Sequence, residues 1–349
     1  MKHPEVKSLP VFRHNVLSTL YSIVIPTYLR SRLLDETIKS ALKTIEPIPD
    51  VNIVVVDNNP ERGDETELMM EKYRNHKNIT YYKNSENIGM VGNWNRCALL
   101  AETKYVILLH DDDLVEPDFM CYIERAITKI GDDKLAILKP RENRWKDEGY
   151  PYQFHQYNSK LKIEKIIAIE NYNGFPIGAP TGCLLNRDIV IRTGGFDENY
   201  NVAAADVDYF IRLNLAYRCY KIKIPLVVYR ISANESLKVE IQYLGYELCY
   251  RLIKSLVYYY NIPGWLFDRY WSKYSEGWAI WIRDQFGIDF NVEEAYQRIG
   301  LKRYGRLEKT IIEKSLRWYV KLIILPLNGK LKIIDMETWS RTIRKWMKI

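Results

Sequence analysis

Four polar residues in a row, His110-Asp111-Asp112-Asp113, end the apolar segment Tyr105–Leu109. Three carboxylates side by side repel one another, so a cation is needed to offset their charge. Ligands of open α/β sheets bind at the carboxyl ends of the strands, and carboxylate oxygens are the ligands that Mg²⁺ takes beside substrate phosphates. The run fits two interpretations: a divalent metal shared with a phosphate-bearing substrate, or a solvated acidic turn.

The segments that would position this run alternate between two periodicities. β-branched and apolar runs of strand length are followed by stretches with apolar residues at helical spacing, which favours βαβ units and a largely parallel sheet. The predicted strands are Ser22–Pro26, Val51–Asp57, Ile79–Tyr82 and Tyr105–Leu109, and the predicted helices between them are 31–44, 65–73 and 93–101.

Three of these strands end in polar or turn residues: Pro26-Thr27-Tyr28, Asp57-Asn58-Asn59 and the His110–Asp113 run. The carboxyl ends of parallel strands lie along one edge of a sheet. We therefore expect the three loops to form a single site.

Further along, the pattern predicts a helix over 116–130, a short strand at 183–186, a helix over 206–217 and a strand at 221–229. Residues 131–175 carry no clear periodicity. From about residue 240 the chain turns to helical patterns rich in Tyr and Trp. We place a domain boundary there.

Composition excludes several classes of protein. The start of the chain is polar, without the apolar segment of a signal peptide. The five cysteines are scattered and lack CxxC spacing, which favours reduced thiols and a cytoplasmic location. Residues 301–349 hold 13 Lys and Arg against 4 Asp and Glu, a net charge of +9. Because the whole chain has a net charge of +7, the other 300 residues have a net charge of −2. A region with that charge does not offer the extended basic surface that nucleic acids require.

The motifs together resemble the family 2 glycosyltransferases, inverting enzymes of bacterial polysaccharide synthesis. The resemblance runs from about residue 21 to 236. It rests on Ser22–Tyr28, Val55–Asn58, Asn87-Ile88-Gly89 with Asn93-Trp94-Asn95, His110–Asp113 with Pro117, Thr181-Gly182, Gly194–Glu198, Asp206-Val207-Asp208 with Arg212-Leu213, and Tyr229-Arg230. It implies a GT-A fold: a Rossmann-like, mostly parallel mixed sheet flanked by helices, here with a C-terminal helical extension.

The resemblance also implies a nucleotide-sugar donor. Asp57 matches the family aspartate that reads the base, and a carboxylate accepting from an imide N–H favours a UDP- or dTDP-sugar. The other residues assigned to nucleotide binding are Pro26, Thr27, Tyr28, Asn87, Asn95 and Asp111.

By resemblance, Asp112 and Asp113 bind the metal, Mg²⁺ or Mn²⁺. The family motif is usually Asp-x-Asp, and His110 stands where its first acidic residue is expected. His110 therefore has three possible roles: it contacts the ribose or diphosphate, it binds the metal, or it forms hydrogen bonds only with the protein itself.

The catalytic base implied by the resemblance is Asp206. The family pair is usually Glu-Asp, and Ala205 takes the place of the glutamate, which leaves the acceptor's identity in doubt. Further contacts to the diphosphate, sugar or acceptor are expected from Gly182, Asp208 and Arg230.

The implied function is metal-dependent, inverting transfer of a sugar to a hydroxyl of a saccharide or lipid-linked acceptor. Two alternatives stay open: a sugar-nucleotide nucleotidyltransferase, and a non-catalytic adaptor that binds membranes or nucleic acid. The nucleotidyltransferase would be expected to carry a glycine-rich phosphate loop, which Pro26–Arg30 is not.

The predicted organisation is an N-terminal extension (1–20), a glycosyltransferase domain (21–238) and a basic helical region (239–349). Within 308–325 and 336–348, apolar residues and tryptophans alternate with Lys and Arg at helical spacing. This pattern fits either helices lying on an anionic membrane surface, here the inner face of the cytoplasmic membrane, or helices packed on the main domain.

Overall fold

The computed structural model describes residues 3, 5–17, 19–131, 135–146, 149–173, 177–231, 237–304 and 306–320. Contacts divide the chain into two compact units. The first comprises residues 1–166, 177–201 and 217–232, and the second comprises 167–176, 202–216 and 233–349. Residues 202–216 thus group with the C-terminal helices, although the sequence placed them inside one domain of residues 21–238.

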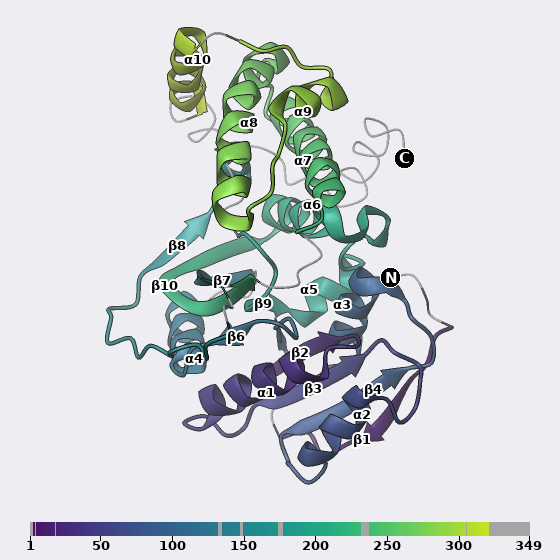
Figure 1. The fold of residues 1–349 in the computed structure, drawn as a ribbon. Coiled ribbons are helices and arrows are strands. Elements are labelled where there is room, and N and C mark those ends of the chain that lie inside the picture. Colours follow the sequence, from purple (N-terminus) through teal and green to yellow (C-terminus); the bar gives the residue numbers. More distant parts are fainter. Residues whose placement is uncertain are drawn as a thin grey trace. The chain divides into compact units, whose positions relative to one another are not determined.

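The first unit is built on a mixed sheet (Figure 1), for which the described residues give the strand order β1-β4-β3-β2-β5-β9-β7-β10-β6, with β8 on β10. Its parallel centre consists of β4 (Ile79–Asn84), β3 (Asn52–Asp57), β2 (Tyr21–Thr27) and β5 (Tyr105–Leu108). These strands lie close to the predicted ones, because runs such as that of β2 are buried along their whole length.

The helices that connect these strands, and the first helix after them, also match the prediction. They are α1 (Ser31–Ile45), α2 (Glu65–Met70) with the short helix η1 (Glu71–Tyr73), α3 (Gly89–Leu100) and α4 (Phe119–Ile130). In α1 the buried residues Leu34, Ile38, Ala41 and Ile45 recur every three or four positions, so one face of the helix enters the core. Asp64 caps α2 by accepting from the backbone N–H of Glu67.

The other half of the sheet contains β6 (Leu114–Val115), β7 (Leu135–Lys146), β8 (Ile163–Ile166), β9 (Cys183–Asn186) and β10 (Arg218–Ile231), with the short helices α5 (Arg187–Arg192) and η3 (Glu198–Tyr200) nearby in sequence. In this half two strands match the prediction, β9 and most of β10, whereas β6, β7 and β8 were not predicted. β9 is antiparallel to both β5 and β7, so the parallel pairing is interrupted there. β7 escaped the pattern because only its first half is buried.

Residues 8–12, expected in an extension, form β1 (Ser8–Phe12), which pairs antiparallel with β4 at the sheet edge. Phe12 is buried in the core. Residues 8–12 are therefore part of the sheet.

The second unit contains η2 (Ala168–Asn173), α6 (Asn201–Ala216, from residue 202), α7 (Val239–Tyr259), α8 (Gly264–Phe286), α9 (Val292–Ile299) and α10 (Arg306–Tyr319). Its core is aromatic: the ring of the fully buried Trp271 lies 5.8 Å from Tyr246 and 5.5 Å from Phe267. No helix among the described residues has the length and apolar character needed to cross a bilayer.

α10 covers the first of the two predicted basic helices. Ile312, Leu316 and Val320 are buried, whereas Ile311 and Trp318 are exposed. Glu313 forms an ion pair with Lys273 of α8 and another with Arg317, so this helix packs within the second unit. The second predicted helix, 336–348, lies outside the described residues.

Candidate functional site

The loops that follow β2, β3 and β5 meet, as the sequence predicted. Thr27 and Asp57 are register partners at the ends of β2 and β3, and the N–H of Asn58 donates to the carbonyl of Thr27 at 2.9 Å. The hydroxyl of Thr27 donates to Oδ2 of Asp111 at 2.7 Å. Residues far apart in the chain therefore share one site at the carboxyl edge of the parallel strands.

Arg30 supplies part of the positive charge that three adjacent carboxylates require. Its Nη1 lies 2.7 Å from Oδ2 of Asp112 and 3.3 Å from Oδ1 of Asp111. The chain reaches Arg30 through Leu29, whose φ of 55° is left-handed and costs a non-glycine residue roughly 1–2 kcal/mol. The sequence reasoning missed Arg30, although three carboxylates just beyond a neighbouring strand were reason to search for a basic residue.

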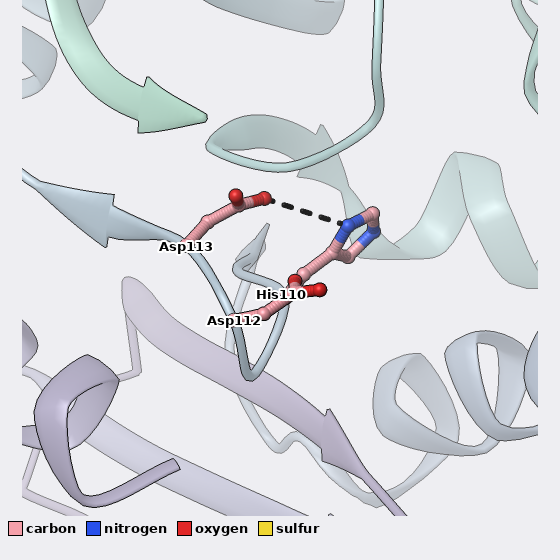
Figure 2. A group of neighbouring side chains, drawn as sticks. All are labelled: His110, Asp112 and Asp113. Atoms are coloured by element: carbon pink, nitrogen blue, oxygen red, sulfur yellow. Dashed lines mark ion pairs between the residues drawn. The ribbon is translucent and has the colours of Figure 1, made fainter. Parts of the chain in front are cut away.

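His110, Asp112 and Asp113 each offer a ligand atom, and these atoms lie within 4.8 Å of one another. Figure 2 shows the Asp113 carboxylate directed toward the His110 ring, with 3.6 Å between Oδ2 and Nδ1. Oδ2 of Asp113 and Nε2 of His110 are buried without a hydrogen-bond partner. Two carboxylates and an imidazole, with unmet polar atoms on Asp113 and His110, fit a divalent cation.

Burial shapes the ionisation of this cluster. It lowers the pKa of His110 to about 4, so the imidazole is neutral at pH 7, as a metal ligand must be. Burial and the neighbouring Asp112 raise the pKa of Asp111 to about 7 and hold that of Asp113 well above its ordinary value. The His110 ring stacks on Trp94, with ring centroids 5.2 Å apart, which fixes its orientation.

Asp57 is fully buried within a charged network. Its Oδ2 accepts from the hydroxyl of Tyr81 at 2.7 Å and lies 3.1 Å from Nζ of Lys83, and its Oδ1 accepts from the N–H of Asn59. Lys83 also donates to Asp64 at 2.8 Å. Burial raises the pKa of Asp57. A nucleotide base that donated a hydrogen bond to the Asp57 carboxylate would therefore do so alongside Tyr81, Lys83 and Asn59.

The other residues predicted for the nucleotide differ in exposure. Tyr28 is 45% exposed, whereas Pro26 is buried within β2. Asn87 accepts from the side chain of Asn58 at 2.8 Å and from the N–H of Gly89, which fixes the turn into α3. The amide of Asn95 donates to the carbonyl of Phe196 and accepts from its N–H, both at 2.9 Å, so both ends of this amide are engaged by the protein itself.

Gly182 and Arg230 connect the cluster to β10. Gly182 has a φ of +68°, and a Cβ there would overlap Cγ2 of Val227, so packing against β10 alone demands glycine. The N–H of Arg230 donates to Oδ1 of Asp113 at 2.8 Å, and its guanidinium pairs with Glu36 at 2.6 Å. The side chain of Arg230 is fully buried.

A second basic residue near the cluster was also missed. Lys139 of β7 is buried, and its Nζ donates to the carbonyl of Thr181 and lies 3.5 Å from Glu142. The N–H of His110 donates to the hydroxyl of the same Thr181 at 3.3 Å. A lysine within the apolar run Leu135–Pro140 is the signal that could have revealed it.

Asp206 and Asp208 lie on α6, in the part of the helix that belongs to the second unit. Asp208 is buried and pairs with Arg212 at 2.6 Å, one helical turn on. Asp206 is partly exposed. The resemblance implied Asp206 as the base, and Arg212, which belongs to the same motif, pairs with Asp208. A ground for preferring Asp206 is that Asp208 serves in a buried ion pair.

Residues 22–194, about half of the chain, match the family model of glycosyl transferase family 2. The chain belongs to this family. Its sheet and its flanking helices have the GT-A-like arrangement that the resemblance implied.

The family 2 match is accompanied by named relatives. The chain is 30% identical to the abequosyltransferase RfbV of Salmonella typhimurium over 122 residues, 34% of this chain and 36% of that protein. It is also 30% identical over 118 residues to the poly(ribitol-phosphate) β-N-acetylglucosaminyltransferase TarS of Staphylococcus aureus, 34% of this chain and 20% of that protein. The matched segments therefore span between a fifth and about a third of these relatives.

Solved structures extend the likeness in fold to most of the chain. The crystal structure of S. aureus TarS 1–349 in complex with UDP has a TM-score of 0.52 at 16% identity, and the match covers 94% of this chain and 91% of that one. A structure of S. aureus TarS has a TM-score of 0.53 at 17% identity, covering 93% and 55% of the two chains.

Proposed function

We propose that this family 2 protein transfers a sugar from a nucleoside-diphosphate sugar to an acceptor hydroxyl with inversion at the anomeric carbon. The observation that carries the proposal is the cluster of His110, Asp112 and Asp113 at the carboxyl edge of the parallel strands, with unmet polar atoms, inside a domain of this family. Family membership favours this reaction over nucleotidyl transfer and over a non-catalytic adaptor.

The donor is a UDP- or dTDP-sugar in this proposal. Asp57 would read the imide of the base, and its buried partners Tyr81 and Lys83 would hold the carboxylate in place. Thr27 and Asp111, joined by a hydrogen bond, would face the ribose beside Tyr28. Support for uridine comes from TarS, whose 1–349 fragment has crystal structures with UDP and with UDP-GlcNAc.

Asp112 and Asp113 would hold Mg²⁺ or Mn²⁺, with the neutral imidazole of His110 as a third ligand. When bound, such a cation neutralises the charge that develops on a departing diphosphate. Arg30 already offsets the charge of Asp111 and Asp112, which keeps the carboxylates together before the donor arrives.

Asp206 would accept the proton of the attacking hydroxyl, a role in which general bases typically contribute about 10²–10⁴-fold in rate. A single in-line displacement inverts the anomeric configuration and needs no covalent nucleophile. Asp206 is partly exposed, which supports this role. Asp208 is less suited to it, because a buried carboxylate in an ion pair is not available to a substrate.

The acceptor in this proposal is a saccharide or lipid-linked saccharide of a bacterial surface polysaccharide, as the names of RfbV and TarS suggest. Residues 301–349, with their excess of Lys and Arg, would attach the protein to the inner face of the cytoplasmic membrane. The exposed side chains of Ile311 and Trp318 on α10 support an interfacial role for this region.

A screen of nucleotide sugars tests the proposal. We expect release of UDP or dTDP from at least one donor in the presence of Mg²⁺ or Mn²⁺, and its loss with a chelator. Asp112→Ala should abolish metal-dependent UDP binding in calorimetry, while Asp50→Ala, at an exposed acidic position, should leave it unchanged. No release from any donor, or metal-dependent binding that survives in Asp112→Ala, would contradict the proposal.

A further inference from the structure

A pocket of about 450 Å³ lies in the first unit near His110, Asp112 and Asp113, between α1 and a facing segment formed by residues 145 and 149–154. None of the assigned roles uses it. Leu114, the residue that follows Asp113, is one of the residues that line it. The rest of the lining forms two walls, one of basic groups on α1 and one of aromatic rings on the facing segment.

The basic wall is formed by Arg32, Lys39 and Lys43, seven and four positions apart and hence on one face of α1. One carboxylate, Glu36, lies among them, so the lining groups balance at +2. Arg32 and Lys39 form exposed ion pairs with Glu36 and Asp35. Exposed pairs of this kind exchange readily with another anion, because each is worth little in water.

The aromatic wall is preformed. Trp145 and Tyr152 have ring centroids 5.5 Å apart, and Tyr152 and Phe154 meet edge to face at 5.4 Å. The hydroxyl of Tyr152 donates to the fully buried Glu116 at 2.7 Å, which fixes the ring. Tyr150 is 76% exposed at the rim, a high exposure for so large a ring.

The two walls touch where Nζ of Lys43 lies 5.1 Å above the ring of Phe154. The pocket is also joined to the metal cluster through Arg230. Its guanidinium lies 4.7 Å from the ring centre of Trp145 and pairs with Glu36, while its backbone N–H holds Asp113. A ligand that displaced Glu36 or moved Trp145 would act on the residue that positions Asp113.

We propose that this pocket binds an anionic saccharide, one that carries a phosphate or a carboxylate, as part of the acceptor; this inference rests on the proposed function. The lysines recognise the anion and the rings cover the apolar face of the sugar. The rings meet at 58° and 85°, so they form a curved wall rather than the parallel slot that suits a flat base.

Binding to the full-length protein without any donor tests the proposal. The probes are glucose, glucose 6-phosphate, glucuronate and inorganic phosphate, measured by saturation-transfer NMR and calorimetry. We expect the two anionic sugars to bind at least about fivefold more tightly than glucose or inorganic phosphate, the size of effect that one or two exposed charges give.

Two pocket variants and one control separate the contributions. Lys43→Ala should weaken binding of both anionic sugars by about threefold to fivefold and leave glucose unchanged. Tyr150→Ala should weaken all three sugars. Lys104→Ala removes another exposed lysine over a ring, 5.3 Å from the centre of Tyr105 and outside the pocket, and should change none. Thermal unfolding verifies that each variant is folded.

Equal binding of glucose and glucose 6-phosphate would overturn the proposal, as would inorganic phosphate binding as tightly as the sugar phosphate. An equal loss in Lys104→Ala would overturn it too, since the effect would then belong to net charge. Because these measurements involve no donor, a failure of sugar transfer would count against the proposed function and leave this result standing.

Discussion

At the scale of residues, the proposed chemistry is based on three adjacent carboxylates. Their repulsion predicted a cation, and the structure supplies both a protein cation, Arg30, and two buried atoms with unmet hydrogen-bonding capacity, on His110 and Asp113. Arg30 could not be paired with Asp112 from the sequence, because 82 residues separate them and only the fold joins them.

The two aspartates of α6 give a prediction at this scale. Asp206→Asn should leave donor binding intact and lower transfer by about 100-fold or more, since it removes only proton acceptance. Asp208→Asn should instead lower the free energy of unfolding by about 3 kcal/mol, because it leaves the cation of Arg212 buried without its charged partner. Steady-state kinetics and urea unfolding of both variants distinguish the roles, and the reverse outcome would move the base to Asp208.

At the scale of elements, the prediction worked where burial is uniform and failed where it changes along a segment. The parallel strands β2 to β5 and helices α1 to α4 follow from continuous apolar runs and helical spacing. β7 was missed because its buried half runs into a polar, less buried one. β10 was shortened because charged residues, Arg218 and Arg230, stand near its ends. β1 was missed because an edge strand with a proline has little pattern of its own.

Gly182, which directly precedes β9, tests how tightly this segment packs against β10. Gly182→Ala forces a Cβ onto Val227 at a left-handed φ of +68° and should lower the free energy of unfolding by about 2–4 kcal/mol. Gly63→Ala is the matched control, because its φ is +73° but no atom lies within 4 Å of the added Cβ. Chemical denaturation should show a clearly smaller loss for Gly63→Ala, and equal losses would mean that backbone strain alone is responsible.

The hydrogen bonds and ion pair that Glu67 of α2 forms with Arg62 and Gly63 should make the stability of the fold depend on pH. Hydrogen bonds from Arg62, with those from Gly63, lower the pKa of Glu67 to about 2 from 4.5. A carboxyl group with a lowered pKa stabilises the folded state above its unfolded pKa, and this contribution is lost as the pH falls from about 4.5 to about 2.

Glu67→Gln should therefore be less stable than the parent by about 1–2 kcal/mol at pH 7, a partly exposed pair being screened by water. Unfolding measured from pH 7 to pH 3 should show this difference shrinking. A difference that stays constant over that range would mean that Glu67 acts by shape rather than by charge.

At the scale of the whole molecule, the sequence predicted a sheet-based domain followed by helices but not how the chain is shared between them. Residues 202–216 group with the C-terminal helices, so the proposed base belongs to one unit, and His110, Asp112 and Asp113 belong to the other. Local patterns assign helices and strands, whereas the grouping depends on contacts between distant segments such as Gly245 of α7 and the carbonyl of Ala203.

The proposed attachment to a membrane can be tested on the full-length chain. Arg344→Glu with Lys345→Glu should lower sedimentation with anionic vesicles at least about tenfold, because each basic residue near such a surface contributes about 1 kcal/mol. Lys160→Glu with Lys162→Glu, at exposed positions, changes the net charge equally and should have little effect. An equal decrease in vesicle binding in the two double variants would contradict attachment through residues 301–349. Binding that does not depend on vesicle charge or on salt would contradict it as well.

Inverting transfer is the central claim, and proton NMR of donor turnover tests it most directly. With a donor that the screen identifies and Mg²⁺ or Mn²⁺ present, water can replace the unknown acceptor, and the anomer formed first is observed before it equilibrates. An α-linked donor should yield the β-sugar first, at a rate that falls about 100-fold or more in Asp206→Asn. An α-sugar formed first, or a rate unchanged in that variant, would contradict the account.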